Sequence, residues 1–250
     1  MHRRGWARFG NHVAVLTAIL LVTATSGCAE EKQASPPATD RMSLRLNFAE
    51  FPDGPPPDKW ADAPVKMANS QDDPGTQWRV EAGKLTSDPT LPERSASYYS
   101  SPKLDAPITS IGARWIFIPK GETKSGAVGI IISDRVLRPP FPLHLSITST
   151  KWTYGVWPPV VKGKRDPTLQ TIKSGNFDPP LNEDGTTMYE VQVTIKGEQA
   201  ELKLPNGETQ VITDQRIAEW PGQYGTFEAW ARNGQTDARI GFTEIWAKAG

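Results

Sequence analysis

The chain has 250 residues, with 28 basic and 28 acidic side chains, one cysteine, 21 glycines and 23 prolines. The balanced charge lacks the basic excess of a nucleic-acid-binding protein, and one cysteine can form neither an internal disulfide nor a thiolate zinc site. Glycine and proline together exceed the average but stay below the fraction typical of low-complexity chains. The composition predicts a folded, turn-rich protein that does not bind nucleic acid.

The first 27 residues have the pattern of a secretory signal peptide. Arg3, Arg4 and Arg8 make the amino-terminal segment positive, and residues 13–25 form an uncharged, mostly apolar run. This run is shorter than the about 20 residues that a membrane-spanning helix needs, and it fits the hydrophobic region of a signal peptide. We predict that residues 1–27 direct export and are then removed.

The only cysteine, Cys28, follows this run directly, in the sequence Thr25-Ser26-Gly27-Cys28. The segment resembles the lipobox of bacterial lipoproteins, in which small residues precede a cysteine that receives a diacylglyceryl group. Thr25 stands where the lipobox usually has leucine. The resemblance implies a protein of the cell envelope, anchored to the outer face of the cell membrane by a lipid on Cys28. The alternative is an ordinary signal peptide cleaved nearby, for instance after Ala29.

Residues 28–41 are predicted to hold the lipidated cysteine and a flexible linker, because this segment is polar, contains Pro36 and Pro37, and lacks periodicity. A single domain is then expected over residues 42–250. Removal of residues 1–27 takes away three arginines and no acidic residue, so the mature protein has 25 basic and 28 acidic side chains, a net charge of −3.

From residue 42 onward, apolar and polar residues alternate with the period of β-strands. The clearest run, residues 189–195, is followed by turn residues and by two further runs at 200–204 and 210–212, which predicts a meander. Other strand-like runs are 77–81, 97–101, 108–118, 127–134, 143–157, 226–232 and 238–247. One helix is expected over residues 214–220, with Asp214 as its N-cap.

Two runs, residues 113–118 and 128–132, are apolar on both faces and rich in β-branched residues. They are too short for buried helices, so they are predicted to be central strands. The predicted fold class is all-β: two antiparallel sheets packed as a sandwich, with at most one or two short helices.

Four segments follow one another along the predicted domain: NFAEFPDGPPPDKW at 47–60, QWRVEAGKLTSD at 77–88, YEVQVTIKGEQAELKLPNG at 189–207 and RIGFTEIWA at 239–247. In this succession they resemble landmarks of the concanavalin A-like lectin and glucanase superfamily, particularly its laminin G-like jelly rolls. The resemblance implies a jelly roll over residues 44–248 that uses one sheet face for carbohydrate. Many relatives have paired acids in the last strand where this chain has Thr243-Glu244, so a calcium site is not expected.

Sugar rings combine apolar faces with polar rims, so aromatic side chains beside polar groups suit them. Eight of the nine tryptophans follow Cys28. The predicted ligand-binding face consists of His144, Trp152, Tyr154, Glu228, Trp230 and Arg232. Alternation places Trp157 on the face opposite Trp152 and Tyr154. The alternative interpretation is that these aromatic residues fill the core or close sheet edges.

A glycoside hydrolase needs two carboxylates at one glycosidic bond. The E-x-D-x-x-E pattern of retaining glucanases in the resembled superfamily is absent, which leaves Glu228 with a second acid such as Glu244 on another strand. His2 and His12 leave with the signal peptide, which excludes a multi-histidine metal site. Neither a metal nor a cofactor is expected. We favour a non-catalytic, lipid-anchored module that binds a glycan or glycolipid; a hydrolase using Glu228, and a structural or protein-partner domain, are the alternatives.

Overall fold

The computed structural model describes residues 43–69, 78–87, 96–119, 126–134, 143–158, 168–230 and 239–250. All of them belong to one compact unit, Thr39–Gly250. The predicted signal peptide, Cys28 and the linker lie outside the described residues, as does Arg232. Among the described residues, no helix has the length and apolar character needed to cross a membrane.

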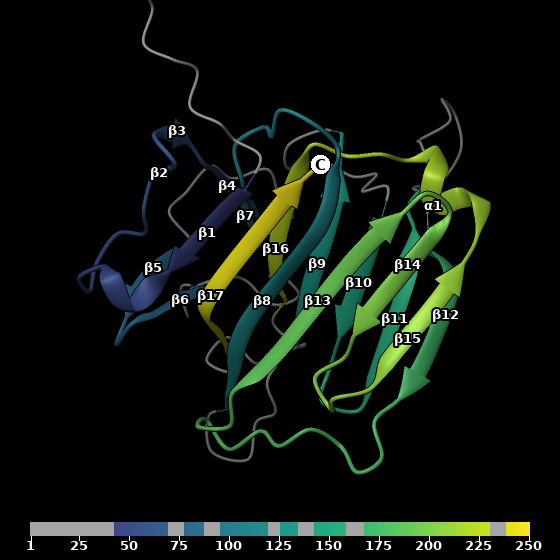
Figure 1. Ribbon diagram of the computed structural model, residues 1–250. Helices are drawn as coiled ribbons and strands as arrows, with labels where there is room; N and C mark the ends of the chain where they lie inside the picture. Colours follow the sequence, from purple (N-terminus) through teal and green to yellow (C-terminus); the bar gives the residue numbers. More distant parts are fainter. Residues whose placement is uncertain are drawn as a thin grey trace, which may run out of the picture. The chain divides into compact units, whose positions relative to one another are not determined.

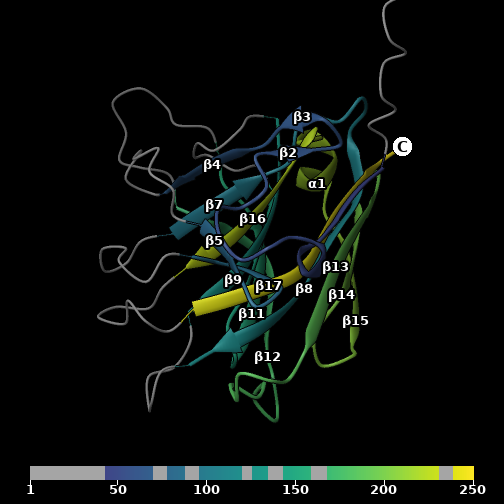
Figure 2. The same ribbon diagram turned by 90° about the vertical axis from the view of Figure 1, so that its left-hand side faces the viewer.

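Two antiparallel sheets form a sandwich, which Figure 2 shows as two layers. The eight-stranded sheet contains β1 (Ser43–Asn47), β5 (Trp78–Glu81), β6 (Lys84–Ser87), β8 (Ile108–Ile118), β13 (Tyr189–Lys196), β14 (Gln199–Lys203), β15 (Thr209–Thr213) and β17 (Arg239–Ala249). Its order is β15-β14-β13-β8-β17-β6-β5, and β1 also pairs with β17. Figure 1 shows β1 beside β17.

The seven-stranded sheet has the order β12-β11-β10-β9-β16-β7-β4. Its strands are β4 (Lys66–Asn69), β7 (Ala96–Ser100), β9 (Ala127–Ser133), β10 (Leu143–Ile147), β11 (Lys151–Val156), β12 (Gln170–Asn176) and β16 (Tyr224–Trp230). A short hairpin joins β2 (Lys59–Trp60) to β3 (Ala63–Pro64), and the described helices are η1 (Phe48–Glu50) and α1 (Gln215–Glu219). The predicted all-β sandwich with one or two short helices is therefore confirmed.

Several strand predictions hold in detail. The meander is β13-β14-β15, with left-handed glycines at its turns, Gly197 and Gly207. The two runs predicted to be central are parts of β8, between β13 and β17, and of β9, between β16 and β10. Asp214 caps α1, because its Oδ1 accepts a hydrogen bond from the backbone N–H of Arg216 at 3.0 Å.

The predicted run 143–157 is a hairpin rather than one strand. Its turn contains neither glycine nor proline: the Thr148 hydroxyl oxygen accepts hydrogen bonds from the backbone N–H groups of Thr150, at 3.3 Å, and Lys151, at 3.1 Å. The hydroxyl of Thr148 thus makes the hydrogen bonds that stabilise this turn. The register of this hairpin, Leu145 opposite Tyr154 and Ile147 opposite Trp152, decides which side chains reach the core.

Aromatic side chains make up much of the core between the sheets. Trp78 packs edge-on against Tyr99, with ring centroids 6.3 Å apart, and Phe227 lies between Trp60 and Phe242 at 6.1 and 6.2 Å. Trp60 and Trp78 are both buried members of this core. The large rings fix how the two sheets stack and so position their outer faces.

Candidate functional site

The outer face of the seven-stranded sheet carries a strip of buried polar side chains. Alternation sends Val128, Ile130 and Ile132 of β9 into the core. The opposite face of the sheet carries a polar set from β7, β16 and β10, with β9 lying between the last two: Tyr98 and Ser100 of β7, Thr226 and Glu228 of β16, and His144 of β10. All five are less than one-tenth exposed. Burial of polar groups costs free energy unless they are paired, so this strip is a candidate functional site.

Glu228 and His144 meet above Gly129. Glu228 lies directly opposite Gly129 on one side of β9, and His144 lies opposite Ile131 on the other side. A Cβ atom at position 129 would stand 2.2 Å from Glu228 Oε2 and 2.9 Å from His144 Nε2. The missing side chain of Gly129 therefore lets the carboxylate and the imidazole approach to 2.9 Å, between Oε2 and Nε2.

Trp157 determines which tautomer the neutral His144 imidazole adopts. The indole Nε1–H donates a hydrogen bond to His144 Nδ1 at 3.0 Å, and the two rings are stacked at a centroid distance of 6.4 Å. Since Nδ1 accepts, the proton of the neutral imidazole is on Nε2. Glu228 Oε2 is close to Nε2 but outside hydrogen-bond alignment, so within the described part of the chain this buried N–H has no hydrogen-bond partner.

Tyr98 completes the group on the β7 side. It lies opposite Glu228 in the strand register and packs with Ala96 and Ile131, against which Trp157 also rests. Burial raises the pKa of the Tyr98 phenol well above its ordinary value, and the negative charge and hydrogen bond of Glu228 raise it further. Tyr98 is thus a neutral hydrogen-bond donor toward a buried carboxylate.

A pair of hydroxyls extends the strip along the same strands. Ser100 Oγ and Thr226 Oγ1 are 2.5 Å apart, and both residues are fully buried. They lie opposite each other, two residues from Tyr98 and Glu228 respectively. We call the set Tyr98, Ser100, His144, Trp157, Thr226 and Glu228 the polar strip.

The structure brings together only part of the predicted binding face. His144 and Glu228 are in contact, and Trp230 lies on the same face of β16 with 37% of its surface exposed. The prediction is wrong for Trp152 and Tyr154, which are only 3% and 1% exposed and point into the core. Their places opposite Ile147 and Leu145 put them on the inward side of the hairpin.

Sequence reasoning missed four members of the polar strip, Tyr98, Ser100, Trp157 and Thr226, and it also missed Gly129 beneath them. The signal for Trp157 was present, because alternation already set it opposite Trp152, and a core position for Trp152 makes Trp157 face outward. A glycine inside an otherwise apolar strand, as Gly129 is in β9, often marks a close approach by another group. Tyr98 had no signal beyond its place in a strand-like run.

The suggested pairing of Glu228 with Glu244 is also wrong. Glu244 lies on β17 between the buried residues Phe242 and Ile245, and its carboxylate contacts Arg45 and, at 3.2 Å, Arg114. These partners are on the outer face of the eight-stranded sheet, so the core separates the two glutamates. They cannot act on one glycosidic bond, which requires carboxylates within about 5–9.5 Å.

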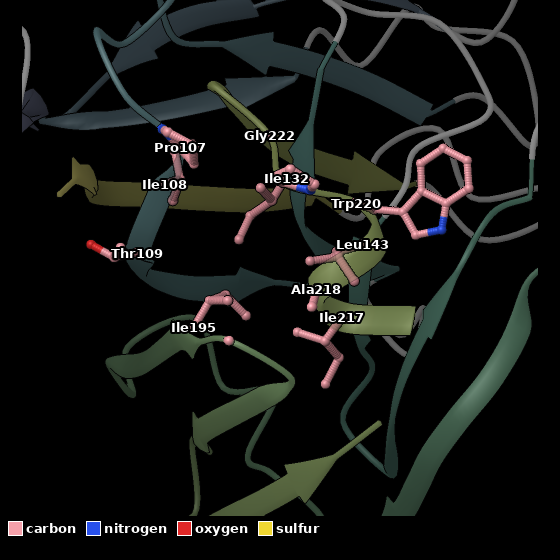
Figure 3. A pocket seen from close by; sticks show the side chains of 12 residues that line it. Pro107, Ile108, Thr109, Ile132, Leu143, Ile195, Ile217, Ala218, Trp220 and Gly222 are labelled. Carbon is pink, nitrogen blue, oxygen red and sulfur yellow. The ribbon is translucent and has the colours of Figure 1, made fainter. Parts of the chain in front are cut away.

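No cluster of three or more histidine, cysteine, aspartate or glutamate side chains in the described ranges could hold a metal ion. A cavity of about 200 Å³ lies at one end of the sandwich, beside α1. Figure 3 shows Ile132, Leu143 and Ile217 converging on it, with Trp220 at its side. Its lining is mainly apolar, with Thr109 as the hydroxyl side chain, so the polar strip is the better candidate site.

No family model matches the chain, and no curated protein matches it. Solved structures do resemble it. A legume lectin-like domain from Entamoeba histolytica has a TM-score of 0.51 at 13% identity, over 74% of this chain and 90% of that one. The Emp47p carbohydrate recognition domain has a TM-score of 0.52 at 12% identity, over 84% and 96%.

A prokaryotic β-1,3-1,4-glucanase from a mouse hindgut metagenome has a TM-score of 0.51 at 8% identity, over 84% of this chain and 100% of that one. At such low identities the likenesses establish the fold alone. The chain has the jelly-roll fold found in lectin-like carbohydrate-recognition domains and glucanases, as the sequence resemblance implied, and this fold does not by itself define a function.

Proposed function

We propose that the protein is an exported, lipid-anchored module that binds a glycan on the outer face of the seven-stranded sheet without cleaving it. One observation carries the binding proposal: His144 offers an N–H with no aligned partner beside the Glu228 carboxylate. A sugar hydroxyl can donate to this carboxylate, whose side chain keeps 12% of its surface exposed, and a small shift of the imidazole would let the same hydroxyl accept from the N–H, which is closed off from solvent. A buried donor without a hydrogen-bond partner costs about 1–3 kcal/mol, so a ligand group that accepts from it gains binding free energy by removing this cost.

Aromatic groups flank this polar pair, as sugar recognition requires. Trp157 is half-buried against His144, and Trp230 is exposed two residues beyond Glu228 on β16. At a strand rise of about 3.4 Å per residue, Trp230 stands roughly 7 Å from Glu228 along the strand. Indole faces can stack on the C–H faces of sugar rings while the polar strip binds their rims.

A non-catalytic role is favoured because Glu244, the partner considered for hydrolysis, lies across the core from Glu228. Binding and hydrolysis respond differently to Glu228→Gln. The amide keeps an acceptor oxygen of the same shape, so a binding module should keep most of its affinity. A hydrolase that depended on this carboxylate would lose turnover.

A glycan array of neutral and acidic oligosaccharides, followed by calorimetric titration of each hit, tests the proposal. We expect Trp230→Ala to weaken binding about tenfold, which is about 1.4 kcal/mol. Trp246→Ala is the matched control, because Trp246 is a half-buried indole on the outer face of the other sheet, next to Arg45. The proposal fails if no glycan binds, if the two variants behave alike, or if sugar is released in a Glu228-dependent way.

Membrane anchoring is proposed from the position of Cys28, the only cysteine, directly after the apolar run of residues 13–25. A diacylglyceryl group on Cys28 would hold the sandwich at the outer face of the membrane through the linker that follows. Cys28→Ala should move the protein from the membrane fraction to the soluble fraction. Retention of this variant in the membrane would contradict lipid anchoring.

A further inference from the structure

A polar pocket of about 280 Å³ lies where the polar strip reaches the end of the seven-stranded sheet. The β2–β3 hairpin contributes Asp62 to its lining, β4 contributes Lys66, the segment after β7 contributes Lys103, and Tyr224 begins β16. We call this hollow the lysine pocket. The lysine pocket is not part of the polar strip, and the proposed glycan-binding role does not depend on it.

The lysine pocket is continuous with the polar strip. Lys66 lies opposite Ser100, and Ser100 lies opposite Thr226, so the three form one row across the outer face. Tyr224 is two residues before Thr226 and four before Glu228 on the same strand. At about 3.4 Å per residue, Tyr224 and Glu228 are roughly 13 Å apart, a span that a ligand of more than one sugar ring would cover.

The charges of the lysine pocket favour an anion. Lys66 and Lys103 are both exposed, and neither forms an ion pair with another described residue. Asp62 is the acidic residue of the lining, so the lining carries two positive side chains and one negative side chain. Lysine attracts anions as a point charge and does not require the fork geometry that arginine imposes. Tyr224 is half-buried and adds an aromatic surface beside the two charges.

A strained turn fixes one wall of the lysine pocket. Ala61 and Asp62 both have left-handed backbone conformations, with φ of 48° and 61°; aspartate adopts this region fairly readily, whereas alanine rarely does. Trp60, only 2% exposed, holds the hairpin by packing against Phe227 at 6.1 Å. Strain of this kind persists where the surrounding structure enforces it, commonly beside functional sites.

We propose that the lysine pocket binds a negatively charged substituent of the glycan, so that the preferred ligand of this face is an acidic oligosaccharide. The inference rests on the proposed glycan-binding function and adds the ligand class. A carboxylate of a uronic acid and a phosphate ester share the required chemistry. The charged substituent would lie between Lys66 and Lys103 while a neighbouring ring lies over the polar strip.

Three tetrasaccharides with the same linkage test this: one of glucose, one of glucuronic acid, and one of glucose with a single phosphate ester. We expect the protein to bind at least one acidic ligand about tenfold more tightly than the neutral one, with the preference shrinking at high salt. The double variant K66Q/K103Q should lose the preference but bind the neutral ligand as before, and K66R/K103R should restore it. The acidic ligand that binds more tightly than the neutral one shows whether the lysine pocket takes a carboxylate or a phosphate ester.

Lys203→Gln is the matched control, an exposed lysine of β14 in the other sheet. Equal affinity for neutral and acidic ligands, or a loss of preference in Lys203→Gln as large as in K66Q/K103Q, would overturn the inference while leaving glycan binding intact. Failure of all three ligands to bind would count against the proposed function itself, and the inference would fall with it. Thermal unfolding of each variant checks that the fold is unchanged.

Discussion

Glu228 Oε2 and His144 Nε2 lie 2.9 Å apart across a strand to which neither residue belongs. Glu228 is on β16 and His144 on β10, and β9 runs between them. Ordinary cross-strand pairs join adjacent strands, whereas this contact bridges three. Gly129 makes it feasible, because any side chain there would occupy the space of the carboxylate.

Gly129→Ala should therefore break the pair. The new Cβ would be 2.2 Å from the carboxylate oxygen, and overpacking of this kind costs about 1–3 kcal/mol. Urea unfolding measures the loss. In a Glu228→Ala background the same substitution should cost less, because the closest clash is gone, although the Glu228 Cβ contact at 2.7 Å remains. Equal costs in the two backgrounds would show that the carboxylate does not occupy this space.

Trp157→Phe should release the imidazole of His144 from its single tautomer. The phenyl ring preserves most of the packing but removes the indole N–H that donates to Nδ1, at a cost of about 1 kcal/mol in stability. Two-bond nitrogen–proton spectra of the imidazole report the tautomer directly, with His144→Gln to assign the signal. The native protein should show Nε2–H alone and the variant a mixture. An unchanged spectrum would mean that Trp157 does not set the tautomer.

Stability should decline at alkaline pH partly through Tyr98. Burial and the Glu228 charge raise the pKa of its phenol, so the folded state holds the neutral form. The unfolded chain releases this proton near the ordinary value of about 10, so the contribution is complete below that pH and is lost as pH rises above it. Urea unfolding between about pH 8 and 11 should show a shallower decline for Tyr98→Phe. Tyr224→Phe, which removes a hydroxyl from the same face, is the control; an equal change in both variants would contradict the assignment.

Asp214→Ala should destabilise the end of the sandwich that α1 covers. Loss of an N-cap costs about 1 kcal/mol, and Ile217 of α1 is almost fully buried. The hydrogen bonds from Arg216 lower the pKa of Asp214, so its contribution is present above the ordinary value of about 3.9 and is lost as pH falls toward the folded-state value. The difference in unfolding free energy between the native protein and Asp214→Ala should be smaller at acidic pH than at neutral pH. Asp214→Asn, whose side chain can still cap the helix, should be destabilised less than Asp214→Ala. A constant difference would indicate that charge plays no part.

The sequence was sufficient for the sheets wherever alternation and glycine turns coincided. The meander β13-β14-β15 and the cap at Asp214 follow from local signals alone. The sequence pattern does not divide the β10–β11 hairpin into two strands, because a hydroxyl of Thr148, rather than glycine or proline, makes its turn. That signal is weak, since threonine is also common inside strands.

The binding face was harder to predict, because alternation gives two faces without saying which one is inward. His144 and Trp152 were placed together, yet the hairpin register sends Trp152 into the core. The contact of His144 with Glu228 depends on residues 84 positions apart and on a glycine in a third strand. Such a meeting is a property of sheet order, which the periodicity of one strand does not contain.

The pairing of β1 with β17 also makes the described sandwich, from Ser43 to Gly250, a nearly closed ring. Ser43 lies opposite Lys248, two residues before the end, so the sandwich begins and finishes at the same point of one sheet. A short linker from Gly250 to Ser43 would close the ring without moving a strand. A cut at the Gly197 turn, where a side chain would touch nothing within 4 Å, would then give new ends to an unchanged sheet order. The position of the chain ends can therefore be changed without changing the order of the strands. A lipid anchor attached at the Gly197 turn of such a variant would leave the proposed binding face unaltered.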